Sequence, residues 1–137
     1  MRVPVFASLL LSLALFTGAP PGMAQDSDPI RSVISAQLEA FRAGDVVAAY
    51  DYASPMIRAI FPTPQVFGEM VGRGYPEISN PGAVEFLGQR EEAGQPVQRV
   101  LLRGEGNLRV FDYTMRQVDG LWRVDGVTPV IDAGNSV

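Results

Sequence analysis

The hydrophobic period of this chain changes from 3.6 residues to 2 near residues 77–82 (EISNPG), and this change limits the folds open to it. Before that point, Ile30, Ile34, Leu38 and Phe41 recur at spacings of three and four, which is typical of a helix with one apolar face. After it, four runs alternate apolar and polar residues, as half-buried strands do. These runs span residues 83–92, 96–104, 107–118 and 121–127. The order predicts an α+β fold, with N-terminal helices packed on one face of a curved four-stranded antiparallel meander.

The beginnings of the helices are marked by short polar residues that stand directly before a proline. Asp28-Pro29, Ser54-Pro55 and Thr63-Pro64 each combine a capping side chain with proline at the first helical position. Asp45 predicts a further helix over 46–53, directly after a helix stop at Gly44. Because their oxygens are expected to accept from free backbone N–H groups, Ser54 and Thr63 are predicted to be caps and not nucleophiles. Residues 72–76 (GRGYP) predict a helix stop followed by an extended turn.

The connections between the strands are short and contain glycine. Residues 93–95, 105–107 and 119–120 separate the four runs, and Asp119-Gly120 is a strong hairpin signal. In the third strand, Phe111 and Tyr113 alternate with Asp112, so the aromatic side is expected to face the helices. The same alternation predicts that Asp125 points away from that side.

The first 24 residues predict a secretory signal peptide. Arg2 precedes an apolar run that is too short to span a bilayer, and small residues lead to a cleavage site after Ala24. We therefore expect an exported protein, periplasmic or secreted, with no membrane segment after cleavage. Residues 25–137 are predicted to form a single domain. Loss of Arg2 leaves 11 − 1 = 10 basic residues against 15 acidic ones, a net charge of −5.

The composition excludes several chemistries. The chain contains neither histidine nor cysteine, so a Ser-His-Asp triad and a zinc site built on His or Cys are impossible. The acidic residues do not cluster as a metal site requires, and no metal or cofactor is expected. The basic residues are all isolated arginines, which argues against a nucleic-acid partner.

Several segments resemble a known family. The helix IRSVISAQLEAFRAGD, followed by short helices and a meander closing on GLWRVDGV, resembles the nuclear-transport-factor-2-like, or cystatin-like, cone fold shared by SnoaL-like cyclases and ketosteroid isomerases. The pattern QLEAFRAGD…AYDYASP…F-TP-F-MV-GYP is similar to an exported bacterial family catalogued as a domain of unknown function. The resemblance covers about residues 29–127. It implies a pocket between helices and sheet, with a predicted lining of Tyr50, Phe67, Met70, Phe111, Tyr113 and Trp122.

Three functions are compatible with this reading. The first is a non-catalytic module that binds a small apolar or amphipathic ligand in the pocket, with Tyr50 and Tyr113 as candidate hydrogen-bond donors. The second is an interaction or dimerisation module that uses the outer face of the sheet, which leaves a homodimer open. The third is a histidine-free isomerase or hydrolase, which requires a buried carboxylate with a raised pKa inside the cone. Arg58 is predicted to be a surface or ion-paired residue, with anion binding at the pocket mouth as the alternative.

Overall fold

The computed structural model describes residues 28–131, in which five helices precede four strands. The predicted signal peptide and the terminal segment 132–137 lie outside the described residues. The helices are α1 (Pro29–Arg42), α2 (Val46–Asp51), α3 (Pro55–Ile60), α4 (Pro64–Gly74) and α5 (Pro76–Ser79). The strands are β1 (Val84–Glu92), β2 (Gln95–Arg103), β3 (Leu108–Val118) and β4 (Leu121–Pro129). The predicted α+β order is confirmed.

The helix caps are those that the sequence predicts. Asp28 Oδ1 accepts a hydrogen bond from the backbone N–H of Ile30 at 3.0 Å, and Thr63 Oγ1 accepts from that of Val66 at 3.1 Å. Ser54 Oγ accepts from the N–H of Ile57 at 3.4 Å. Each of these oxygens satisfies a donor that a helix leaves free in its first turn.

The prediction for residues 72–76 is wrong in one respect. The segment after α4 is not an extended turn, because Pro76 begins the short helix α5. Tyr75 occupies the cap position and makes no side-chain capping bond. A proline alone therefore starts this helix, without the short polar cap that marks the other starts.

The four strands form an antiparallel meander in the order β1-β2-β3-β4. Two of the connecting turns place a non-glycine residue at positive φ before a glycine: Ala93 at 51° and Asp119 at 51°. Register shifts interrupt the pairing of β1 with β2 between Phe86 and Gln89, and that of β3 with β4 next to Thr114. Such bulges increase the local twist and re-aim nearby side chains.

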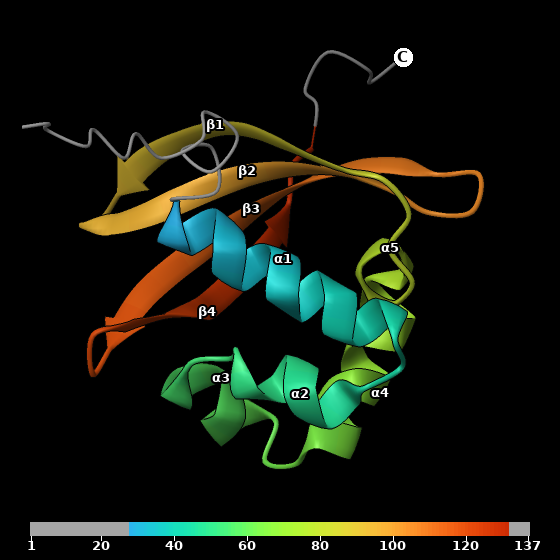
Figure 1. The fold of residues 1–137 in the computed structure, drawn as a ribbon, viewed down its shortest axis with the longest axis horizontal. Helices are drawn as coiled ribbons and strands as arrows, with labels where there is room; N and C mark the ends of the chain where they lie inside the picture. Colours follow the sequence, from blue (N-terminus) through green and yellow to red (C-terminus); the bar gives the residue numbers. More distant parts are fainter. Residues whose placement is uncertain (1–27, 132–137) are drawn as a thin grey trace, which may run out of the picture.

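The helices cover one face of the curved sheet (Figure 1). Helix α1 lies against the sheet, and α2, α3 and α4 form a further layer beyond it. The centre of the core is made by side chains with no exposed surface, among them Ile34 of α1 and Phe111, Tyr113 and Met115 of β3. The opposite face, called the outer face here, carries Arg99 of β2 and Asp112 and Thr114 of β3, and no helix lies on it in Figure 1.

The segment between α2 and α3 pairs with the free edge of β4. The backbone N–H of Val124 donates to Tyr52 O at 2.8 Å, and that of Ser54 donates to Val124 O at 2.9 Å. Ala53 and Val124 thereby form an isolated parallel bridge. This pairing fixes the start of α3 directly beside β4.

Candidate functional site

A cavity of about 320 Å³ lies between the helices and β4. It is bounded by side chains of α1, α3, α4 and α5 on one side and by residues 124–128 of β4 on the other. Its volume is at the lower end of the roughly 300–1,000 Å³ that small-molecule sites span. The lining consists of Gln37, Phe41, Ala53, Met56, Ile57, Phe61, Phe67, Met70, Val71, Tyr75, Ile78, Val124, Asp125, Gly126, Val127 and Thr128.

The apolar wall opposite the sheet is built on α4. Phe67, on the buried face of that helix, packs against Phe41 with ring centroids 5.8 Å apart and against Tyr50 at 5.4 Å. Met70 and Val71 continue the same wall. Helix α4 presents these side chains together because they recur at three and four residues along it.

Gln37 is the deepest polar side chain of the lining. It is only 3% exposed, and its Nε2 donates to the carbonyl of Ala49 in α2 at 3.1 Å. No described residue donates a hydrogen bond to its Oε1. The fully buried, unpartnered side-chain atoms of the described residues are Tyr113 Oη and Asp125 Oδ1, and Gln37 Oε1 is not among them. Gln37 lines the cavity, so a side-chain acceptor without a donor among the described residues belongs to a residue of its wall.

Asp125 is 5% exposed, although alternation places it away from the helices, on the outer face. It falls at the register shift of β4, where Thr114 pairs with Gly126 and Met115 with Val124, so that Asp125 has no partner in β3. Its Oδ2 accepts from Gln95 at 3.0 Å and lies 3.5 Å from the Arg116 guanidinium. The residue therefore contributes to the cavity lining while its carboxylate is engaged from the outer face.

The electrostatics of Asp125 do not suit proton abstraction. Burial disfavours its charge, but the hydrogen bond from Gln95, the nearby Ser54 hydroxyl and the Arg116 guanidinium outweigh this and lower the pKa of the carboxyl. Its Oδ1 is fully buried and unpartnered, so it does not face the open cavity. A carboxylate with a lowered pKa and no accessible oxygen is a poor general base.

The structure separates the six predicted lining residues into two groups. Phe67 and Met70 line the cavity. Tyr50 lies behind the wall, where its hydroxyl donates to Phe61 O at 2.6 Å. Phe111 is part of the core, and Trp122 packs at the edge of the core next to a shallow hollow near Gln95.

Tyr113 is also away from the cavity. It has no exposed surface, its hydroxyl has no hydrogen-bond partner among the described residues, and burial raises the pKa of the phenol. Arg58 forms an ion pair with Asp51 at 3.5 Å and stacks over the Tyr50 ring, as the surface reading of this residue predicts.

Gln37 was missed by reasoning from sequence. It follows Ile34 by three residues and precedes Phe41 by four, so it falls on the apolar stripe of α1. A polar residue on an otherwise apolar stripe is the signal that identifies it, because a buried polar group needs a partner from the protein, from water or from a ligand.

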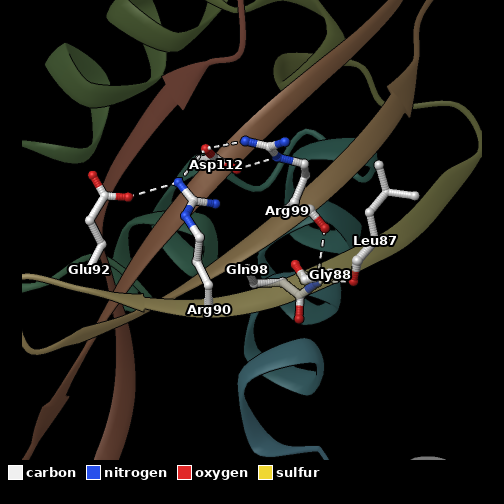
Figure 2. A network of polar contacts seen from close by, with 7 residues as sticks. All are labelled: Leu87, Gly88, Arg90, Glu92, Gln98, Arg99 and Asp112. Carbon is white, nitrogen blue, oxygen red and sulfur yellow. Dashed lines mark hydrogen bonds and ion pairs between the residues drawn. The ribbon is translucent and has the colours of Figure 1, made fainter.

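The outer face carries a second cluster of polar groups, shown in Figure 2. Arg99 lies directly opposite Asp112 and binds both of its carboxylate oxygens, at 2.9 and 3.0 Å. Arg90 contacts the same carboxylate at 2.9 Å and Glu92 at 2.8 Å. Hydrogen bonds from Arg99 and Arg90 outweigh burial and lower the pKa of Asp112 to about 2.

Figure 2 also shows how a backbone carbonyl at the bulge of β1 gains a hydrogen-bond donor. The side-chain amide of Gln98, which has no exposed surface, donates to the carbonyl of Leu87 at 2.9 Å. Its oxygen accepts from Gln89 at 3.2 Å and from Arg31 of α1 at 3.3 Å. These polar groups bond to one another and to Gln89 and Arg31, as the groups of a structural cluster do.

Residues 28–131 contain no group of three or more potential metal ligands. Within the same residues, no helix combines the length and the apolar character needed to cross a membrane.

Comparisons with known proteins give one relationship. Neither the curated proteins nor the solved structures gave a match to this chain. The family model described as "Domain of unknown function (DUF4864)" matches residues 23–137, which include every element of the fold and every residue of the cavity. The chain therefore belongs to the DUF4864 family.

Proposed function

We propose that this protein is a small-molecule-binding module that holds an apolar or amphipathic ligand in the cavity between its helices and β4. The supporting observation is the cavity itself, which is about 320 Å³ in volume and lined mainly by aliphatic and aromatic side chains. Protein interiors are close-packed, and voids larger than a water molecule are few. A largely apolar hollow with a few polar groups at its wall is the usual form of a ligand site.

A binding role has more support than catalysis. An isomerase or hydrolase without histidine needs an inward carboxylate with a raised pKa, as in the enzymes of similar predicted fold. Among the described residues, Asp125 is the carboxylate that lines the cavity, and its pKa is lowered. The proposal therefore assigns no catalytic residue and no cofactor.

The proposal also includes export of the protein and a relationship to the nuclear-transport-factor-2-like fold. Residues 1–24 have the pattern of a signal peptide, so we place the binding site in an exported protein, in the periplasm or outside the cell. The order of helices and hairpins resembles the nuclear-transport-factor-2-like cone, in which a pocket between helices and sheet is the expected site.

The test fills the cavity. Ile57 lines it from α3, whereas Ile60 of the same helix is 60% exposed and does not line it. We expect N-phenyl-1-naphthylamine, a neutral apolar fluorescent probe, to bind the mature protein saturably with one probe per chain. The probe should shift the amide resonances of Ala53, Val71 and Val127. Ile57→Trp should weaken binding at least about tenfold, because its indole occupies the space, and the matched variant Ile60→Trp should bind as the parent does.

The proposal fails if saturating probe leaves the resonances of the cavity residues unchanged. It also fails if Ile57→Trp and Ile60→Trp, both shown to be folded, bind the probe equally well.

A further inference from the structure

The polar groups of the cavity limit the chemistry of what it holds. We infer that the ligand is a neutral apolar molecule with a hydrogen-bond donor, such as a hydroxyl or an amide N–H, which it donates to Gln37 Oε1. This inference rests on the proposed function and assigns Gln37 as the residue that determines specificity.

The orientation of the Gln37 amide is fixed by its neighbours. Its Nε2 donates to Ala49 O at 3.1 Å. The reversed amide would place Oε1 against that carbonyl, and two acceptors would then face each other. Since the amide is planar, anchoring Nε2 also fixes the direction of Oε1, which has no donor among the described residues.

A buried acceptor without a donor favours ligands that supply one. A polar group that is removed from water loses favourable hydration free energy unless a new hydrogen bond replaces it. An apolar ligand that displaces water from the cavity and has no donor therefore leaves Oε1 unsatisfied. A ligand with a donor at that position restores the bond. The difference favours a hydroxyl over a matched ether by about five- to tenfold in dissociation constant.

The same lining disfavours charged ligands. The described residues that line the cavity include no arginine, so a carboxylate or sulfonate has no counter-charge there. A cation also finds no free partner, because Asp125 Oδ2 is engaged by Gln95 and Arg116 and Oδ1 is closed off. An unpaired charge in an apolar cavity is strongly disfavoured, which leaves neutral molecules.

Three probes with one ring system separate these chemistries: 2-naphthol carries a donor, 2-methoxynaphthalene has none, and 2-naphthoate is an anion. Calorimetric titration of the mature protein at neutral pH should give the tightest binding for 2-naphthol, about five- to tenfold weaker binding for the ether, and at least tenfold weaker binding for the anion. Gln37→Met keeps the length of the side chain and removes the acceptor, so it should bring the alcohol and the ether within about twofold of each other.

Two features keep this test interpretable. Ala49 O retains the N–H of Tyr52 as a donor at 3.3 Å in Gln37→Met, so no carbonyl is left without a partner. Gln65→Met makes the same exchange at an exposed position of α4 that does not line the cavity, and it should behave as the parent.

The outcomes separate the two proposals. If the probes bind but the parent does not prefer the alcohol, or if the preference persists in Gln37→Met, the inference about the donor is overturned and the binding function stands. A preference for 2-naphthoate overturns the inference as well. If none of the three probes binds, the proposed function fails and the inference fails with it.

Discussion

At the cavity, Gln37 keeps an amide oxygen without a partner among residues 28–131, whereas on the outer face of the sheet both oxygens of Asp112 are engaged by arginines. The first region has space and an unsatisfied acceptor. The second has two cations and two acids that satisfy one another at 2.8–3.0 Å. In this molecule the charge-rich region is closed by its own contacts, and the sparsely polar region is the one in which we propose that a ligand binds.

The largest effect is expected at the apolar wall of the cavity. Phe67→Ala removes a buried ring that contacts Phe41 and Tyr50, and it should lower the free energy of unfolding by about 3–5 kcal/mol. Val66→Ala on the exposed side of the same helix should change it by less than about 0.5 kcal/mol. Denaturant unfolding measures both. A loss below about 1 kcal/mol for Phe67→Ala would mean that the wall is not packed in solution as it is in the structure.

A smaller, pH-dependent effect is expected on the outer face. The pKa of Asp112 is lowered from 3.8 to about 2, so its charge stabilises the folded state fully above pH 4, and this contribution is lost as the pH falls toward 2. At neutral pH, Asp112→Asn should lower the free energy of unfolding by about 1–2 kcal/mol, and the difference from the parent should shrink as the pH falls toward about 2 and disappear below it.

Ligand binding should not respond to that change. Affinity for N-phenyl-1-naphthylamine is expected to be the same in Asp112→Asn and the parent at neutral pH, which a fluorescence titration measures. A loss of affinity in Asp112→Asn would show that the cavity and the outer face of the sheet are coupled.

The smallest effect on the free energy of unfolding is expected at the start of α4, which belongs neither to the cavity nor to the outer face. Thr63→Ala removes the oxygen that caps α4 and should lower the free energy of unfolding by about 1 kcal/mol without changing probe affinity. Thr63→Ser keeps the oxygen and serves as the control. Equal stability of the alanine and serine variants would contradict the capping role.

The sequence was sufficient to predict most of the fold. The helix starts at Pro29, Pro55 and Pro64 were predictable because each follows a short polar cap. The strands were predictable because their hydrophobic residues recur with a period of 2. Helix α5 was not, since Tyr75 provides no capping oxygen. The burial of Asp125 was not predicted either, because it depends on a register shift in β4 and on contacts with Gln95 and Arg116.

The site was less predictable for a different reason. Periodicity identifies side chains that point toward the interior, but it does not distinguish those that fill the interior from those that surround a space. Phe111 and Tyr113 belong to the first kind and Phe67 and Met70 to the second. Which residues surround a space depends on how α3 and α4 sit over β4, and that arrangement involves contacts distant in sequence.

The bridge between Ala53 and Val124 has a consequence for the behaviour of the protein in concentrated solution. An open sheet has two edges, and an exposed edge with free N–H and C=O groups invites association with the edge of another molecule and hence aggregation. Beside Val124, the edge of β4 is occupied by the chain's own backbone. The edge strand β1 carries Glu85, Arg90, Glu91 and Glu92, charges of the kind that discourage such pairing. The sheet is thus protected at one edge by backbone pairing and at the other by charge.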